Sequence, residues 1–353
     1  MPDEQTRPVV LRREPDLVTA SLGFVAEAAR EAAATLPEGA VALARSWGRQ
    51  LPRPGHGSTT ELWEALATLG ASDLSVARIT EPHVDALAIL AEAGQPAPAE
   101  DTTWGVYAAE GPGARLEARQ HGEGWRLDGL KPWCSLAGHL SHALVTAWVD
   151  DSRRGLFAVD LRHAGVAPLE DAWHAGGLRA VPSGPVRFVD VPAGEVGGPG
   201  WYLRRDGFAW GGMGVAAVWY GGAVGVARRL LHAARDRTPD QVALMHIGTA
   251  DAALAGARSM LLDAAAHVDA GTARGQAGAV LAQRLRQVVA DAAEQVLTCV
   301  DHGLGPGPLA LEPRHATRVA DLRLYLRQHH AERDAAALGR QVLDTLGADG
   351  SPW

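Results

Sequence analysis

Two short runs of this sequence combine residue types that could support chemistry. Residues 129–138 read Gly-Leu-Lys-Pro-Trp-Cys-Ser-Leu-Ala-Gly and contain Lys131, the only lysine of the chain. An ammonium and a guanidinium are not interchangeable at a packed site, so we interpret Lys131 as the anchor of a turn and give it no catalytic role; chance retention is the alternative. Residues 329–332 read His-His-Ala-Glu. A histidine there could act as a base near neutral pH, whereas a metal site needs more ligands than this run supplies.

The composition is that of a globular protein. The 353 residues are 47% hydrophobic and 21% charged, with a net charge of −8, and this length allows two or three domains. The negative charge argues against a nucleic-acid or anionic-membrane surface. Two cysteines, Cys134 and Cys299, exclude a disulfide scaffold and a four-cysteine zinc site. The sequence shows neither an apolar leader nor a membrane span, so we expect a cytoplasmic protein without membrane insertion.

Helical patterns fill the first part of the chain. We expect helices over residues 16–36, 62–69 and 81–93, separated by proline- and glycine-containing loops. The run Ser58-Thr59-Thr60-Glu61 predicts a capping box, in which side chains and amides of the first turn bond reciprocally.

The middle of the chain, from about residue 104 to 196, predicts strands. Short runs of alternating apolar and polar residues indicate an antiparallel β-barrel or sandwich; examples are 114–119, 125–128, 142–148 and 186–191. Gly122-Glu123-Gly124 and Asp128-Gly129 predict hairpin turns, because such residues accept positive φ at little cost.

From about residue 207 the pattern is helical again and indicates a four-helix bundle. Two apolar faces recur at steps of three and four residues; they comprise Val242, Met245, Thr249, Leu254, Ala257 and Leu261, and Val280, Leu281, Leu285, Val288, Val289, Val296, Leu297 and Val300. A last long helix is expected over 315–346. The predicted fold class is therefore α+β, with an N-terminal helical domain (1–100), a middle antiparallel β-barrel (101–200) and a C-terminal four-helix bundle (201–353).

Three runs in this order carry a resemblance to a known family. Residues 124–135 read Gly-Trp-Arg-Leu-Asp-Gly-Leu-Lys-Pro-Trp-Cys-Ser, residues 177–192 contain Gly-Leu-Arg and end in Phe-Val-Asp-Val-Pro, and residues 216–223 read Ala-Ala-Val-Trp-Tyr-Gly-Gly-Ala. Their types and spacing resemble the acyl-CoA dehydrogenase family, in which a helical domain, a β-barrel and a helical bundle surround FAD.

The resemblance implies a flavin site in the first of these runs. Trp133 is expected against the flavin ring and Ser135 within hydrogen-bonding distance of flavin N5, with Cys134 between them. An aromatic plate shields a planar redox ring from water, and a small hydroxyl can donate to N5 without blocking hydride approach. By residue type alone, Trp133 could equally be a barrel core residue and Ser135 an ordinary strand-end hydroxyl.

Two further segments match the flavin-binding pattern in part. Residues 105–113, with Tyr107, correspond to the first flavin-contacting loop, but Ala109 stands where the family has threonine, so backbone amides remain as the contacts there. Arg237 could pair with the flavin pyrophosphate, although the Phe-Gly that follows in the family is absent. A charge at a helix end is the alternative reading of Arg237.

The catalytic glutamate of the family is missing. Aligning Asp321 and Tyr325 with the family pattern puts His329 at its position, and no carboxylate stands at the alternative position near 210–212. Adjacent histidines on a helix point about 100° apart, so at most one of His329 and His330 would face a flavin. We predict His329 as the base; a solvated helix face is the alternative.

These observations predict an FAD-dependent oxidoreductase, divergent from acyl-CoA dehydrogenases, that acts on the CH–CH group of an acyl thioester or on a related small molecule. A flavin-dependent monooxygenase on the same fold and a non-catalytic assembly paralogue are the alternatives. We expect a homodimer or homotetramer packed through the C-terminal bundle, and an electron-transfer partner is consistent with the dehydrogenase reading.

Overall fold

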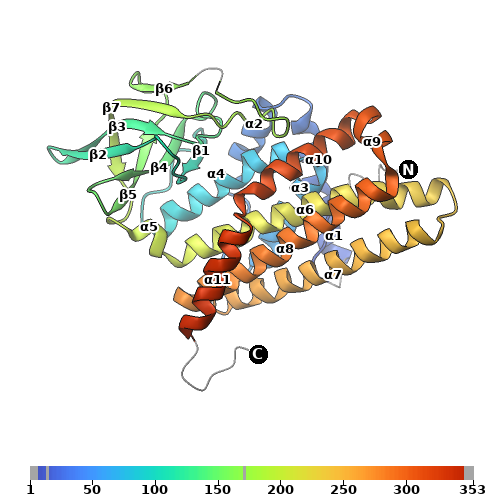
Figure 1. The fold of residues 1–353 in the computed structure, drawn as a ribbon. Coiled ribbons are helices and arrows are strands. Elements are labelled where there is room, and N and C mark those ends of the chain that lie inside the picture. The colour runs from blue at the N-terminus through green and yellow to red at the C-terminus, as the bar shows by residue number, and fades with distance from the viewer. Residues whose placement is uncertain (1–6, 13–15, 170–171, 346–353) are drawn as a thin grey trace. The chain divides into compact units, whose positions relative to one another are not determined.

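The computed structural model describes residues 7–12, 16–169 and 172–345 (Figure 1). Their backbone forms two compact units. The barrel unit comprises residues 31–51 and 75–208, and the helical unit comprises the described residues of 1–30, 52–74 and 209–353. The three-domain division expected from the sequence stays a prediction. Among the described helices, none combines the length and the apolar character needed to cross a membrane.

The barrel unit contains a sheet of seven strands in the described part of the chain. These are β1 (Trp104–Tyr107), β2 (Leu116–His121), β3 (Gly124–Lys131), β4 (His142–Trp148), β5 (Arg154–Asp160), β6 (Val166–Pro168) and β7 (Val186–Glu195). Strands β4, β2, β3, β7 and β5 form a closed ring, because β5 pairs back to β4; β1 adds to β4 and β6 to β7. A small barrel therefore forms where the alternating runs predicted one.

The sequence predicted a wholly antiparallel barrel, but two of the strand pairs are parallel. β1 runs parallel to β4, and β2 meets β4 in parallel through Glu117 and Trp148. Parallel neighbours need a long connection, and the β2–β3 hairpin lies between β1 and β4 in the chain and supplies that length.

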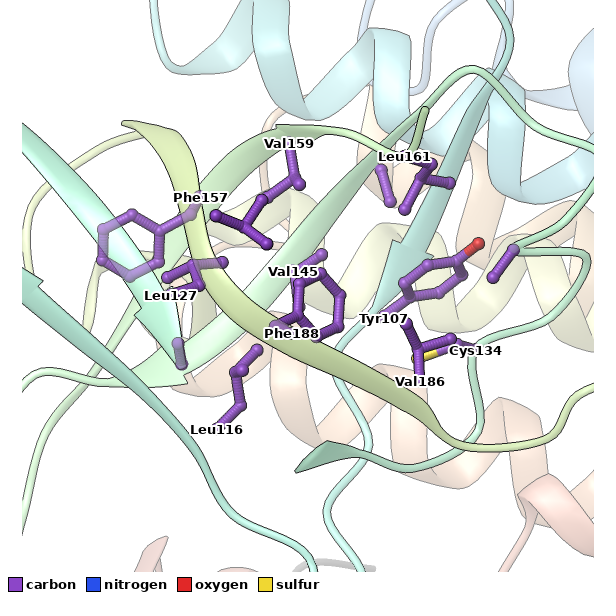
Figure 2. Close-up of a cluster of buried hydrophobic side chains, with 14 of the residues drawn as sticks. Tyr107, Leu116, Leu127, Cys134, Val145, Phe157, Val159, Leu161, Val186 and Phe188 are labelled. Atoms are coloured by element: carbon purple, nitrogen blue, oxygen red, sulfur yellow. The ribbon is translucent and has the colours of Figure 1, made fainter. Parts of the chain in front are cut away.

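The barrel is filled by apolar side chains from its strands (Figure 2). Phe157, Leu127 and Phe188 are buried in this cluster. β4 is buried along nearly its whole length because it is covered on two sides. Val145 faces the barrel interior, whereas Leu144 packs with residues of α4 (Leu74–Glu92) in a second cluster.

One predicted hairpin turn is confirmed and the other is wrong. Gly122, with a φ of 61°, turns the chain between β2 and β3. Asp128-Gly129 instead lies inside β3, where the register with β7 shifts between Leu127 and Gly129. Gly129 has a φ of 126°, and a Cβ there would lie 2.2 Å from the Arg115 carbonyl oxygen. A β-bulge can place a glycine at positive φ, as a hairpin turn does, so residue type alone did not separate the two.

Two short helices and one long helix, α4, complete the described part of the barrel unit. α2 (Glu38–Trp47) and α5 (Trp201–Arg204) were not expected from the sequence. α4 begins at Leu74, earlier than the predicted helix over 81–93, and continues through Pro82.

The helical unit is built from helices, most of them long (Figure 1). They are α3 (Thr59–Ser72), α6 (Asp206–Asp236, from residue 209 on), α7 (Gln241–Asp269), α8 (Gly275–Leu304), α9 (Pro306–Leu311), α10 (Pro313–Tyr325) and α11 (Glu332–Thr345), together with most of α1 (Asp16–Ala33). The predicted apolar face of α8 is largely buried, including Leu285, Val289 and Val296. The predicted face of α7 is correct only in its second half, because Val242 is 59% exposed and Met245 is exposed too, whereas Ala257 and Leu261 are buried. The expected oligomer stays a prediction.

The predicted capping box at the start of α3 does not form. Ser58 occupies the N-cap position without a side-chain hydrogen bond. The Asp269 carboxylate at the end of α7 takes its place, accepting the amides of Gly57 and Thr59 at 3.0 Å each and the Thr59 hydroxyl at 2.6 Å. A charged acceptor bonds amides more strongly than a hydroxyl does, and its negative charge suits a helix N-terminus.

The single helix expected over 315–346 is also wrong. α10 ends at Tyr325, a 3₁₀ turn follows over Leu326–Gln328, and α11 begins at Glu332. His329 is extended, with φ −89° and ψ 121°, and Ala331 has a φ of 46°. The Asp334 carboxylate accepts the His330 amide at 3.0 Å, so α11 starts with a cap of its own.

Glycines allow α3 and α6 to cross closely. A Cβ on Gly221 would lie 1.9 Å from the Ala67 carbonyl oxygen, and one on Gly70 would lie 2.5 Å from that of Val218. Both obstacles are backbone atoms, which cannot rotate away as a side chain can.

We predict that Gly221→Ala lowers the free energy of unfolding by about 2 to 3 kcal/mol, because the two helices must move apart. Gly248→Ala is the matched control: Gly248 is also within a helix, but no atom lies within 4 Å of its Cβ position. The control should gain about 0.5 to 1 kcal/mol from helix propensity. Urea unfolding of both variants measures the difference, and equal midpoints would contradict the close crossing.

Candidate functional site

The run that follows β3 forms a strained turn that exposes Trp133. Trp133 and Leu136 have φ values of 59° and 58°, a region that non-glycine residues rarely occupy. Backbone hydrogen bonds hold the turn, from the Cys134 amide to the Gly184 carbonyl at 3.0 Å and from Leu136 to Pro182 at 2.8 Å. The turn is therefore fixed against the segment that precedes β7.

The Trp133 side chain is suited to stack a planar ring. It is 55% exposed, so it is not a barrel core residue. Trp173 packs edge-on against it, with ring centroids 6.5 Å apart and an interplanar angle of 89°. The Trp173 indole N–H is buried without a hydrogen-bond partner. An exposed aromatic face held by a second aromatic ring fits the planar isoalloxazine of a flavin.

Ser135 lies at the centre of a polar cluster. Its hydroxyl is 3.1 Å from Nη2 of Arg78, on α4, and 2.8 Å from the Ser183 hydroxyl. Its carbonyl accepts the Tyr107 hydroxyl at 2.9 Å. Arg78, Ser183 and Trp173 were not predicted from the sequence as site residues. They belong to separate segments, and a tryptophan in a polar loop was the only sign in the sequence.

Tyr107 and Cys134 support the turn from inside the barrel (Figure 2). Burial raises the pKa of Tyr107 well above its usual value, so the phenol stays a donor to Ser135. Burial also raises the pKa of the Cys134 thiol to about 12, and its Sγ lies 3.3 Å from the Lys131 carbonyl. Both side chains are buried and position the backbone of the turn; their expected part in cofactor binding stays a prediction.

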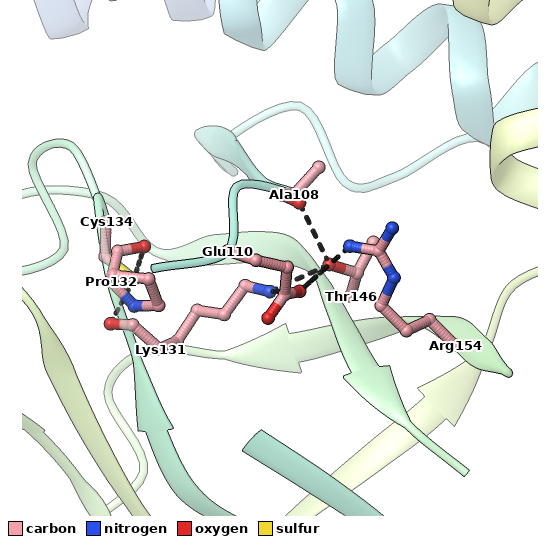
Figure 3. Close-up of polar contacts among 7 residues, drawn as sticks. All are labelled: Ala108, Glu110, Lys131, Pro132, Cys134, Thr146 and Arg154. Atoms are coloured by element: carbon pink, nitrogen blue, oxygen red, sulfur yellow. Dashed lines mark hydrogen bonds and ion pairs between the residues drawn. The ribbon is translucent and has the colours of Figure 1, made fainter. Parts of the chain in front are cut away.

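An ion pair between the buried Lys131 and the partly exposed carboxylate of Glu110 joins this turn to the loop after β1 (Figure 3). Lys131 is 1% exposed, and its Nζ donates to Glu110 Oε1 at 2.7 Å and to Thr146 Oγ1 at 2.8 Å. Arg154 donates to the same carboxylate oxygen at 3.0 Å. Burial lowers the pKa of Lys131, with Glu110 acting in the opposite direction. This geometry agrees with the expectation that Lys131 anchors a turn.

The ion pair brings together residues 105–113 and the Trp133–Ser135 run, which were predicted from the sequence to belong to one flavin site. Gly111, next to Glu110, packs on the turn, since a Cβ there would lie 3.3 Å from Cγ of Pro132 and 3.8 Å from Nε1 of Trp133. Ala109 is exposed beside them. The backbone of this loop is therefore close to the Trp133 ring and could contact a flavin stacked there.

The helical unit holds His329 in a separate cluster. The ring is 6% exposed, with its centroid 6.4 Å from that of Trp219 and Nε2 3.9 Å from the Asp334 carboxylate. Nε2 is buried without a hydrogen-bond partner. Burial lowers the pKa of His329, with Asp334 opposing the shift, so the neutral form that can accept a proton is favoured. His329 is thus not on a solvated helix face, whereas its neighbour His330 is exposed.

Arg286 connects this cluster to the start of α6. Its guanidinium lies 4.6 Å from the Trp219 ring centroid and donates to the carbonyls of Gly212 at 3.0 Å and Gln328 at 2.9 Å. The two positions at which the family resemblance places a base, 210–212 and 329, are therefore close together. Arg237 is exposed between α6 and α7, and its role stays a prediction.

This architecture is the acyl-CoA dehydrogenase fold, and the resemblance predicted from the sequence is confirmed for the fold. KijD3, solved with FMN and dTDP-3-amino-2,3,6-trideoxy-4-keto-3-methyl-D-glucose, has a TM-score of 0.79 at 19% identity over 98% of this chain and 97% of its own. TdsC from Paenibacillus sp. A11-2, solved with FMN and indole, gives 0.74 at 18% over 93% and 99%. Butyryl-CoA dehydrogenase from Megasphaera elsdenii gives 0.71 at 18% over 81% and 82%. No protein-family model and no curated protein sequence matches the chain.

We predict that Glu110→Gln lowers the free energy of unfolding by about 3 kcal/mol, because it leaves the buried Lys131 ammonium without a counter-charge. The pKa of Glu110 is lowered: burial opposes its ionisation, but Lys131 and Arg154 together outweigh burial. A carboxylate with a lowered pKa stabilises the fold above its unfolded pKa, near 4.5, and this stabilisation is lost as pH falls.

The matched control is Glu117→Gln, on β2, whose carboxylate also pairs with two cations, but these are the exposed Arg115 and Arg119. Exposed pairs contribute less than about 1 kcal/mol. Unfolding at pH 7 and at pH 3.5 tests both statements. An equal effect of the two substitutions at pH 7, or a loss in Glu110→Gln that does not shrink with acid, would contradict the role of the ion pair.

Proposed function

We propose that this chain is a flavin-dependent monooxygenase that uses reduced FMN to oxidise a small organic molecule. The observation that carries the proposal is that His329, which the family resemblance aligns with the dehydrogenase carboxylate, is buried and has a lowered pKa. The similarity to KijD3 and TdsC, both solved with FMN and matched over nearly their whole length, supports it. Reduced flavin supplies two electrons for dioxygen, one oxygen atom going to the substrate and the other to water.

The residues of the barrel unit have defined roles in this proposal. Trp133 covers one face of the ring and excludes water from it, Ser135 exchanges a hydrogen bond with N5, and the backbone beside Ala109 contacts the ring edge. FMN ends in a single phosphate and needs no pyrophosphate site, which agrees with the missing Phe-Gly after Arg237. FAD remains the cofactor of the second candidate.

The second candidate is an acyl-CoA dehydrogenase-like enzyme acting on an acyl thioester. Its support is the similarity to butyryl-CoA dehydrogenase. Proton abstraction next to a thioester needs a base, and His329 is the candidate. If the purified protein binds no flavin, the remaining candidate is a non-catalytic paralogue that keeps the fold as an assembly partner.

We predict that the purified protein binds one flavin per chain, FMN more tightly than FAD, and turns yellow. Trp133→Ala should weaken FMN binding about 10- to 100-fold, since an aromatic anchor contributes about 1.5 to 3 kcal/mol. Trp133→Phe retains a ring and should retain most of the affinity. Quenching of flavin fluorescence measures all three proteins. A parent protein that quenches neither FMN nor FAD would contradict the proposed function.

We predict that proton transfer during turnover depends on His329 and not on His330. The pKa of His329 is lowered by burial, so its neutral, proton-accepting form should persist below the usual pKa of about 6.5. Activity should therefore fall only at a pH below that value. His329→Ala should lower the rate about 10² to 10⁴-fold and remove this acid limb, whereas His330→Ala, at an exposed position, should keep it.

The assay combines a flavin reductase with FMN and tests indole, a dTDP-amino sugar and butyryl-CoA between pH 5 and 9. Oxidation of butyryl-CoA with an artificial electron acceptor and without oxygen would favour the dehydrogenase. If both histidine variants match the parent at every pH, the His329 assignment is wrong while flavin binding stands.

A further inference from the structure

The Ser135 hydroxyl has two polar neighbours and only one proton. A serine hydroxyl donates one hydrogen bond and accepts up to two, whereas an arginine guanidinium can only donate. Arg78 Nη2, at 3.1 Å, therefore occupies one lone pair of Ser135. What remains is one lone pair and the proton, and the contact with Ser183 at 2.8 Å can use either of them.

Ser183 has the same choice. Its hydroxyl lies 2.9 Å from the Val181 carbonyl, which can only accept, and 2.8 Å from Ser135. If Ser183 donates to Val181, Ser135 must donate to Ser183. If Ser183 donates to Ser135, the Ser135 hydroxyl can donate its hydrogen bond to another acceptor. The two arrangements differ only in the rotation of two hydroxyl groups.

These two arrangements match the two states of a flavin. N5 accepts a hydrogen bond in oxidised flavin and carries a hydrogen, and so donates, in reduced flavin. With an acceptor present, Ser135 donates to it and accepts from both Arg78 and Ser183. With a donor present, Ser135 accepts hydrogen bonds from that donor and from Arg78. Ser135 then donates its hydrogen bond to Ser183, and Ser183 donates to the Val181 carbonyl. Ser135 makes three hydrogen bonds in either state.

We infer that Arg78 and Ser183 are positioning residues that let Ser135 reverse its hydrogen bond as the flavin changes redox state. The inference rests on the proposed function. Ser183 supplies the acceptor that Ser135 needs when N5 carries a hydrogen, so it matters most for the reduced flavin. Arg78 holds the hydroxyl in place in both states, and its positive charge favours the electron-rich reduced ring.

The backbone supports a fixed placement for this relay. The Ser135 carbonyl accepts the Tyr107 hydroxyl, and the amides of Cys134 and Leu136, on either side, donate to Gly184 and Pro182. Because the turn and the 182–184 segment are joined on both sides of Ser135, the two hydroxyl groups stay within contact while their protons reorient.

The test compares dissociation constants for oxidised and reduced FMN, the latter under anaerobic conditions, together with the midpoint potential. We expect Ser183→Ala to raise the ratio of the dissociation constant of reduced FMN to that of oxidised FMN about tenfold, because without Ser183 the Ser135 proton has an acceptor at N5 only when the flavin is oxidised. That ratio corresponds to a potential about 30 mV lower for a two-electron couple. Arg78→Met should shift the potential in the same direction, and Ser152→Ala, an exposed serine of the barrel unit, should not shift it.

The outcomes separate the inference from the proposed function. If the parent binds no flavin, the proposed function fails and the inference with it. If the parent binds flavin and Ser183→Ala weakens both redox states equally, or neither, Ser183 has a structural role only and the inference alone is overturned. Thermal unfolding of the flavin-free variants identifies a loss that comes from folding.

Discussion

The site in the barrel unit depends on one buried positive charge. An ammonium out of contact with water must be paired, and the only lysine of the chain meets that requirement with Glu110 from the loop after β1 and Thr146 from β4. The Lys131 ammonium has three donors, and two acceptors are close to it. A guanidinium would bring five donors to the same place, more than these two acceptors can satisfy.

The exposure of Trp133 follows from this pairing. The strand that ends in Lys131 is fixed at its last residue, so the chain must turn at once to reach the 182–184 segment. The turn uses positive φ angles at Trp133 and Leu136, and it leaves the indole ring outside the barrel while Cys134 is directed inward. The strain of about 1 to 3 kcal/mol that such a residue carries is offset by the hydrogen bonds on both sides of Ser135.

The features predicted correctly from the sequence are those that depend on local pattern. Alternation located most of the barrel strands, glycine chemistry located Gly122, and the Trp-Cys-Ser run located the exposed ring. The features that were missed depend on partners distant in the sequence. Arg78 and Ser183 are 57 and 48 residues from Ser135 in the sequence. No sequence pattern near Ser135 predicts that they contact it.

The same reason explains the errors in the helical unit. Helical periodicity continues across residues 326–331, but a buried histidine and the carboxylate of Asp334 break the helix there. Apolar periodicity also could not show which end of α7 is covered. His329 is buried while His330 is exposed, and the reason is a break in the helix and not the helical angle between them. The role of His329 as a base stays a prediction.

The hydrogen bonds of Asp269 have a consequence for the order of folding. They join the start of α3 to a residue 210 positions later, and the helical unit as a whole combines residues 52–74 with residues beyond 208. During synthesis the barrel unit, whose strands all lie between residues 104 and 195, is complete while α3 still lacks its cap and its partner helices. Contacts so far apart along the chain close slowly. A ribosome-bound chain therefore holds α3 without its α6 contacts until α6 has emerged, and without its Asp269 cap until the end of α7 has emerged.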